Sequence, residues 1–397
     1  MIIEPKIRGF LCLNAHPTGC AGLVASAVAC ADEYAARNAA HKPNIKNALV
    51  IGASTGYGLA ARIALACGAG ASTAGVFLER PATESRTASA GWYNSAAFAD
   101  TMRARNVYAA SLCGDAFDQG IKNKTVDLIK RDLGRVDAVI YSLAAPRRKM
   151  PDGTVYNSVL KTVGKEFCEK SLDMRGDALT AVTVPAASRD EIDATIKVMG
   201  GGDFAEWLYA LRAADALAPD ARAIAFSYIG PPFTAPVYYD GTIGLAKRDL
   251  ELTAAKLRAE GINARVAVNS AAVTQASAAI PVVPLYISVL RKVMKEKRLH
   301  EAPAAQMCRL FFNSLDNFDS DGRIRLDNLE LRPDVQAAVQ KNWQNLTPDN
   351  LTSLADVDGF KKDFYNLFGF RLDSVDYSQP VDPLIPIAGL AAEDAVN

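Results

Sequence analysis

Apolar runs of strand length alternate with helical patterns between residues 46 and 275. The first run, NALVIGAS at 47–54, is almost continuously apolar until its glycine, which is typical of a strand buried on both faces of a parallel sheet. We expect six such strands, at 47–54, 73–79, 107–116, 136–145, 221–230 and 263–273. The alternation predicts an α/β protein with a Rossmann-type, doubly wound parallel sheet and helices on both faces.

Helical patterns fill most of the intervals between these runs. We expect helices at 59–68, 94–106, 118–134, 203–217 and 241–261. Asn94 opens the second of them, and asparagine is a residue type that caps helix N-termini, so we expect it to be the N-cap.

Additional segments surround this core. The pattern breaks between 145 and 202, which we interpret as an insertion on the rim of the sheet, near the substrate site and long enough to be functional. The segment 276–397 is mainly helical and ends in a proline-spaced tail that we expect to drape over the surface. We interpret 1–397 as a single large domain.

Charge and composition exclude several classes of partner. The 44 basic and 44 acidic residues cancel, so no net field favours nucleic acid or an anionic membrane. The apolar stretch 49–66 is interrupted by glycine, polar and charged residues and does not fit a membrane span. The charged N-terminal MIIEPKIRGF lacks the apolar region of a secretory signal, and the seven cysteines form no C-x-x-C pair, so we expect a cytoplasmic protein. The three dispersed histidines predict no metal site.

A glycine-rich loop separates the first predicted strand from the first helix. Its pattern is G-x-x-x-G-x-G, in which glycines let the backbone turn tightly and approach a pyrophosphate at a helix N-terminus. Strand, loop and helix occur in the right order, so we interpret 46–275 as a dinucleotide-binding Rossmann core. The expected cofactor-binding residues of the loop are Gly52, Ala53, Ser54, Thr55, Gly56, Tyr57 and Gly58.

Glu79 ends the second predicted strand, 21 residues after Gly58. A carboxylate about 20 residues beyond the glycines can accept hydrogen bonds from the adenosine ribose and would repel a 2′-phosphate. We therefore expect Leu78 and Glu79 to bind the cofactor and to favour NADH. Two alternatives to this interpretation remain. The neighbouring Arg80 can hold a 2′-phosphate, which would favour NADPH, and Glu79 can simply be a solvated strand end.

The ends of the third and fourth predicted strands supply further candidates by position. Asp115 and Ala116 end the third strand, where a carboxylate can meet the adenine amino group. Leu143 and Ala144 end the fourth strand, where small or backbone-exposing residues pass under the cofactor. We expect all four to bind the dinucleotide.

The stretch PVYYDGTIGLAK contains a tyrosine and a lysine that are candidates for catalysis. Many reductases of this fold use Tyr-x-x-x-Lys, but Ile243 stands four residues before Lys247. Tyr238 precedes Lys247 by nine positions, which on one helix means a rise of about 13 Å and opposite faces. The two can act together only if Tyr238 lies before the helix and folds back, with Gly241 as a hinge and Thr242 as the N-cap.

The chain resembles the V-type NADH-dependent enoyl-acyl-carrier-protein reductases and trans-2-enoyl-CoA reductases. The resemblance covers nearly the whole chain, and the Tyr-x8-Lys spacing with GTIG between is specific. The residues that carry it are KIRGF, HPTGC, GASTGYGLAAR, GWYNSAAF, GDAF, YSLAAPRR, VMGG, YYDGTIGLAK, VTQASAAIPVVPLY, KVMKEK and LFGF. Where family members often carry HEGC, this chain has HEAP, so we assign no role to that position.

The resemblance implies roles for the candidate residues. Tyr238 would stabilise or protonate the enolate formed after hydride transfer from NADH, and Lys247 would hold the cofactor. Tyr228 would bind substrate, and the alternative is a core aromatic whose hydroxyl is satisfied. The implied contacts at the nicotinamide end are Val273, Thr274 and Gln275. Tyr239, with spacing one residue shorter, remains the alternative to Tyr238.

The implied activity is reduction of the C2–C3 double bond of trans-2-enoyl thioesters in fatty acid synthesis. The partner would be an acyl-CoA substrate or acyl carrier protein, and the resemblance implies a monomer. The basic run at 291–298 could receive coenzyme A phosphates or an acidic carrier protein, but such a run is more often a solvated helix face. Two other functions stay open: a carbonyl reductase that uses Ser227, and a non-catalytic NADH-sensing protein.

Overall fold

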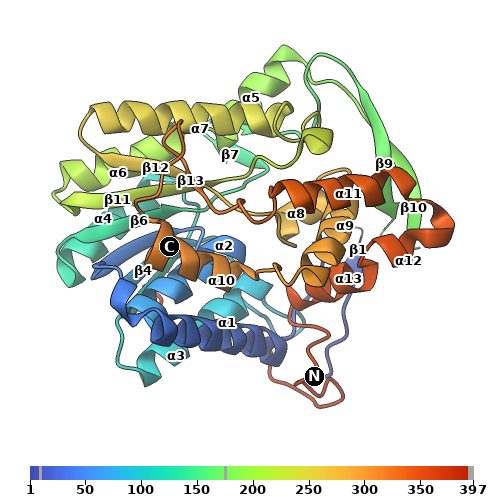
Figure 1. Ribbon diagram of the computed structural model, residues 1–397. Coiled ribbons are helices and arrows are strands. Elements are labelled where there is room, and N and C mark those ends of the chain that lie inside the picture. The colour runs from blue at the N-terminus through green and yellow to red at the C-terminus, as the bar shows by residue number, and fades with distance from the viewer. Residues whose placement is uncertain (9–10, 174–176, 392–397) are drawn as a thin grey trace.

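The computed structural model describes residues 1–8, 11–173 and 177–391 (Figure 1). Its centre is a seven-stranded sheet in which all pairs are parallel. The strands follow in the order β5 (Ala109–Cys113), β4 (Ser72–Phe77), β3 (Asn47–Ile51), β6 (Val136–Tyr141), β11 (Leu217–Ser227), β12 (Asn263–Val268) and β13 (Ile324–Arg325). The order reverses between β3 and β6, which confirms the predicted doubly wound sheet.

The strands form where the sequence is continuously apolar. Ala48, Leu49, Val50 and Ile51 of β3 are all 0% exposed, because helices cover both faces of the sheet. All six predicted strands are present, although most are shorter than expected at their ends. The seventh, β13, was missed: it has only two residues and pairs with β12 at the sheet edge.

Each face of the sheet has its own helical layer and apolar cluster (Figure 1). One layer contains α4 (Gln119–Asp132), α6 (Gly202–Ala213) and α7 (Thr242–Ala259). The other contains α1 (Pro17–Arg37), α2 (Gly56–Ile63), α3 (Ala90–Ala104) and α10 (Pro303–Arg309). The N-terminal addition, which includes the short hairpin of β1 (Ile7–Arg8) and β2 (Leu11–Cys12), thus contributes α1 to the core.

The expected N-cap of α3 is wrong. The helix begins at Ala90 with Ser89 as its N-cap, and Asn94 is buried inside it, where its amide donates to the Ser54 carbonyl at 3.2 Å. Gly91, in the first turn of this helix, allows a close approach: a Cβ there would lie 1.9 Å from Glu79 Oε1.

The insertion consists of two antiparallel hairpins and a helix. These are β7 (Arg147–Lys149) with β8 (Val155–Asn157), β9 (Phe167–Asp173) with β10 (Ala178–Val184), and α5 (Arg189–Met199). The β9–β10 hairpin reaches the C-terminal helices, where Lys170 Nζ donates to the Trp343 carbonyl at 2.9 Å (Figure 1).

The C-terminal helices build a third apolar cluster beside the carboxyl ends of β11 and β12. They are α8 (Gln275–Ala279), α9 (Val283–Glu296), α11 (Pro333–Asn345), α12 (Leu351–Leu354) and α13 (Val357–Asn366). The tail then runs along β5. The Ser111 N–H donates to the Gly389 carbonyl at 3.1 Å, and the Ala391 N–H donates to the Ser111 carbonyl at 2.8 Å. Among the described residues, no helix is long and apolar enough to cross a membrane.

Candidate active site

The glycine loop between β3 and α2 has the close packing that its glycines predict. Gly52 has φ 83°, and a Cβ there would lie 2.1 Å from the Ser142 carbonyl oxygen. A Cβ on Gly58 would lie 1.9 Å from the Gly52 oxygen. Only glycine fits at these two positions, and the turn aims the first residues of α2 across the carboxyl edge of the sheet.

The N-terminus of α2 is open to an anion. Thr55 is the N-cap, but its side chain makes no capping hydrogen bond, so the first backbone N–H groups of the helix remain available. Tyr57 turns away from this end, because its hydroxyl donates to the Ser270 carbonyl at 2.6 Å. Its predicted contact with a cofactor therefore rests on its backbone.

Glu79 lies two residues beyond the end of β4 rather than at its end. It is held in place by Ser54, whose hydroxyl donates to Glu79 Oε1 at 2.6 Å. Burial raises the pKa of Glu79, and the Ser54 hydrogen bond opposes that rise. Leu78 beside it is 70% exposed.

The other two position-based pairs also follow their strands instead of ending them. Asp115 and Ala116 come after β5, where Asp115 Oδ1 accepts from the Phe117 N–H at 3.0 Å and closes a turn. Leu143 and Ala144 come after β6. All four lie at the same edge of the sheet as the glycine loop, as the parallel topology requires.

Tyr238 lies in the loop before α7 and packs back onto the helix. Its carbonyl oxygen accepts from the Gly244 N–H at 2.9 Å. A Cβ on Gly244 would lie 1.8 Å from the Tyr239 carbonyl oxygen, so this contact depends on glycine. The expected N-cap is wrong, because Gly241 caps α7 and the Thr242 hydroxyl instead donates to the Val159 carbonyl of the insertion.

Lys247 is in the second turn of α7 and points to the end of β11. Its ammonium donates to the Phe226 carbonyl at 3.1 Å. In the part of the chain that the structure describes, no carboxylate pairs with it, and burial lowers the pKa of Lys247 to about 8. Its remaining N–H donors are free for a polar ligand such as ribose hydroxyls.

Tyr228, directly after β11, contacts both Tyr238 and Glu330. Its ring meets the Tyr238 ring edge-on, with centroids 4.8 Å apart, and its hydroxyl donates to Glu330 Oε1 at 2.8 Å. Tyr239 takes another direction, since its ring stacks with the Arg248 guanidinium, 5.0 Å from the ring centroid. The geometry therefore favours Tyr238 over Tyr239 as the partner of Lys247.

The loop after β12 completes the edge. Thr274 is the N-cap of α8 in a capping box with Ser277, and its methyl group lies 3.8 Å from the Cβ position of Gly56. Val273 and Gln275 flank it in the chain, and of the three predicted residues Thr274 lies against the start of α2.

Buried polar atoms without a partner mark this same region. Within the described residues, Ser227 Oγ and Asn269 Oδ1 have no hydrogen-bond partner, and they end β11 and follow β12. Asn94 Oδ1, beside Ser54, is another such atom. A polar ligand at the carboxyl edge of the sheet would give these atoms hydrogen-bond partners. The residues at this edge therefore fit a bound dinucleotide.

The basic run at 291–298 is largely neutralised. Arg291 and Lys295 both pair with Asp356, at 2.8 and 2.9 Å, and Lys297 pairs with Asp334 at 3.0 Å. Arg291 also pairs with Asp363. These contacts tie α9 to α11 and α13, which weakens the interpretation as a phosphate or carrier-protein site.

Family comparisons match nearly the whole chain. Residues 86–315 match the trans-2-enoyl-CoA reductase catalytic region, and residues 2–84 match the NAD(P)H binding domain of trans-2-enoyl-CoA reductase. The chain belongs to the trans-2-enoyl-CoA reductase family. Residues 318–381 match a third model, described as the enoyl reductase FAD binding domain.

Relatives of this reductase family are similar over their full length. A trans-2-enoyl-CoA reductase [NADH] of Ruminiclostridium cellulolyticum is 49% identical, over 98% of this chain and 100% of the relative. An enoyl-[acyl-carrier-protein] reductase [NADH] of Opitutus terrae is 50% identical over the same shares. The crystal structure of a Clostridium acetobutulicum trans-2-enoyl-CoA reductase with NADH is 41% identical, covers 98% of this chain and 100% of its own, and superposes with a TM-score of 0.93.

The segment whose family description names FAD does not fit a flavin. Apolar side chains of α11 and α13, including Trp343 and Phe360, pack into one cluster with α9. A cavity between α9 and α12 measures about 280 Å³ and is lined mainly by charged side chains. Pockets for drug-sized ligands begin near this volume, and FAD is larger, so we derive no step from a flavin.

Two residues of the candidate site were not predicted from the sequence: Gly244 and Glu330. Gly244 could have been predicted from the sequence. It stands between a tyrosine and a lysine whose spacing does not fit one helix face, and a glycine at such a place indicates close backbone approach. Glu330 carried no such signal, since it stands in the irregular stretch DNLE, about 100 residues after the tyrosine that it binds.

Glu79→Ala should raise the preference for NADPH over NADH, measured as the ratio of kcat/KM values, by roughly tenfold or more. The substitution removes a carboxylate that would repel the 2′-phosphate. Glu84→Ala, which removes an exposed carboxylate nearby, is the control and should leave the ratio unchanged. An unchanged ratio in Glu79→Ala contradicts the assignment.

Gly244→Ala should displace Tyr238 and lower kcat for crotonyl-CoA, a short trans-2-enoyl thioester, by roughly 100-fold. Gly202→Ala, in the first turn of α6, is the matched control, because the nearest atom to its added Cβ would be 3.7 Å away. Wild-type turnover in Gly244→Ala would show that the contact with the Tyr239 carbonyl does not position the loop.

Proposed function

We propose that the protein reduces the C2–C3 double bond of trans-2-enoyl thioesters with NADH, with Tyr238 and Lys247 as its catalytic residues. The observation that carries the proposal is that these residues, nine positions apart, both contact the carboxyl end of β11: Lys247 bonds the Phe226 carbonyl, and the Tyr238 ring packs on Tyr228. The names of the similar proteins supply the substrate class and the cofactor.

Bound NADH would supply a hydride to C3 of the enoyl thioester. Negative charge then accumulates on the thioester oxygen, and the Tyr238 hydroxyl would donate a hydrogen bond or a proton to it. Burial raises the pKa of Tyr238, which keeps the phenol protonated and able to donate. The Lys247 ammonium would hold the ribose and keep the local potential positive, which eases charge development on the phenol.

Tyr228, which packs against Tyr238, would bind the thioester from the other side. The proposed cofactor contacts are those of the glycine loop, Glu79 with Leu78, Asp115 with Ala116, Leu143 with Ala144, and Val273 to Gln275. The acyl group would be carried by coenzyme A or by acyl carrier protein. We further propose, from the family resemblance, that the enzyme acts in the cytoplasm as a monomer.

The assay that tests this function follows NADH absorbance with crotonyl-CoA and, separately, with acetoacetyl-CoA. Oxidation with crotonyl-CoA alone is the expected outcome. Oxidation with acetoacetyl-CoA alone would indicate a carbonyl reductase, in which the unpartnered Ser227 hydroxyl would act. Binding of NADH without oxidation would indicate a sensor.

Tyr238→Phe should lower kcat by roughly 100- to 1,000-fold while leaving the Kd for NADH nearly unchanged, because the hydroxyl acts only on the developing charge. Tyr239→Phe is the matched control, with the same atom removed from the adjacent residue, and should keep near-wild-type kcat. A reversed result would transfer the role to Tyr239.

A further inference from the structure

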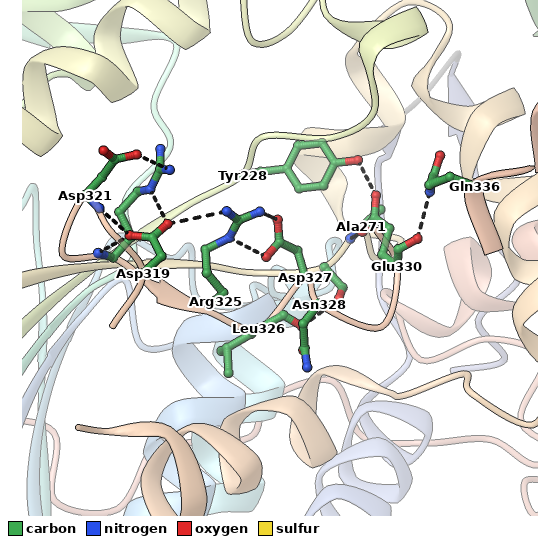
Figure 2. Close-up of polar contacts among 12 residues, drawn as sticks. Tyr228, Ala271, Asp319, Asp321, Arg325, Leu326, Asp327, Asn328, Glu330 and Gln336 are labelled. Atoms are coloured by element: carbon green, nitrogen blue, oxygen red, sulfur yellow. Dashed lines mark hydrogen bonds and ion pairs between the residues drawn. The ribbon is translucent and has the colours of Figure 1, made fainter. Parts of the chain in front are cut away.

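Glu330 is a fully buried carboxylate at the edge of the candidate active site. Its Oε1 accepts from the hydroxyls of Tyr228 and Tyr286, at 2.8 and 2.6 Å. Its Oε2 accepts from the Ala271 N–H at 2.5 Å. Figure 2 shows the Tyr228 hydroxyl turned toward Glu330 rather than away from it. One side chain thus binds the end of β11, the segment after β12 and helix α9.

The segment that carries Glu330 is firmly anchored (Figure 2). Leu326 donates its N–H to the Val268 carbonyl at 2.8 Å, in continuation of the β12–β13 pairing. Arg325 makes a two-bond ion pair with Asp327, at 2.8 and 2.7 Å. Gln336 Nε2 donates to the Glu330 carbonyl at 2.8 Å. Glu330 therefore cannot withdraw from Tyr228 without disturbing the sheet edge.

The charges around Glu330 leave both of its protonation states accessible near neutral pH. Burial raises the pKa of Glu330 to about 7, and the hydrogen bonds from Tyr286, Ala271 and Tyr228 oppose that rise. Asp327 adds a small further rise, although Arg325 pairs with it. Tyr57 of α2 is a further titratable group near the carboxylate.

A count of hydrogens shows what each state does to Tyr228. A phenol has one hydrogen and can donate once. While Glu330 is ionised it can only accept, so the Tyr228 hydrogen points to Glu330 and the hydroxyl offers a substrate only a lone pair. When Glu330 is protonated, its own hydrogen can be donated to Tyr228, which frees the Tyr228 hydrogen for another acceptor.

The alternative recipient of that hydrogen, Tyr286, is less suited to it. Tyr286 is 0% exposed, and its oxygen already accepts from Gln336 Nε2 at 3.4 Å. In the described part of the chain, the one carboxylate that its hydroxyl bonds is Glu330, and the Tyr228 oxygen lies close enough to accept from it as well. Tyr286 therefore keeps donating in both states, and the Glu330 hydrogen goes to the half-buried Tyr228.

We propose that Glu330 is a positioning residue that sets the direction of the Tyr228 hydroxyl hydrogen, and thereby decides whether Tyr228 donates to the thioester oxygen. Protonated Glu330, Tyr228 and the substrate oxygen form a chain in which each hydrogen bond strengthens the next. No proton is transferred to the substrate through this chain. The inference rests on the proposed function, in which Tyr228 binds the thioester.

The test is the ratio of kcat/KM for crotonyl-CoA between the wild type and Tyr228→Phe, measured at saturating NADH across the neutral range. The ratio should fall roughly tenfold or more between about pH 6 and about pH 8.5, because Glu330 passes from mostly protonated to mostly ionised. A structural role for Glu330 alone would leave the ratio constant.

Two further variants make the assignment specific to Glu330. In Glu330→Gln the amide NH2 donates to Tyr228 at every pH, so the contribution of Tyr228, from Glu330→Gln with and without Tyr228→Phe, should become independent of pH. Tyr286→Phe removes a donor to the carboxylate and should move the transition to higher pH.

Either a constant wild-type ratio or a pH-dependent ratio in the Glu330→Gln background overturns the proposal. The wild-type ratio needs no Glu330 variant, so the test stands even if Glu330→Gln folds poorly. Failure of the wild type to oxidise NADH with crotonyl-CoA at any pH would instead overturn the proposed function. Turnover with a constant ratio overturns only the role of Glu330.

Discussion

The candidate active site depends on one close backbone contact, between the first turn of α7 and the loop before it. Gly244 lets the Tyr238 and Tyr239 carbonyls lie against the helix, at a distance that no Cβ would permit. This contact holds the loop that carries Tyr238 against the helix that carries Lys247. Two residues whose spacing looks unsuitable on a regular helix therefore both contact the carboxyl end of β11: Lys247 bonds the Phe226 carbonyl, and Tyr238 packs on the Tyr228 ring.

The sequence predicts the sheet well because its strands are buried on both faces. Runs such as 47–54 must then be apolar at every position, which is a strong local signal. The cofactor residues were predicted for a related reason: in a parallel sheet, positions that follow successive strands meet at one edge. The order of the strands along the chain was enough to predict Glu79, Asp115 and Leu143 at this edge, and in the structure each lies just beyond the end of its strand.

The misses have a common physical origin in contacts between distant segments. Asn94 looked like a cap, but it is buried against Ser54. Thr242 also looked like a cap, but its hydroxyl bonds the insertion. β13 is too short to have a periodic pattern, since it exists only through its pairing with β12. Glu330 has no local signal, because the two tyrosines that donate to it come from distant parts of the chain.

Both edges of the central sheet are completed by residues from the last fifth of the chain. β13 closes one edge, and the backbone at 389–391 lies along β5 at the other. During synthesis, the five inner strands and β5 are made long before either closing segment leaves the ribosome. In the nascent chain the edge at β12 stays open until β13 is made, and the edge at β5 stays open until 389–391 are made; open edges invite pairing with other chains. Protection by chaperones should matter most in that interval.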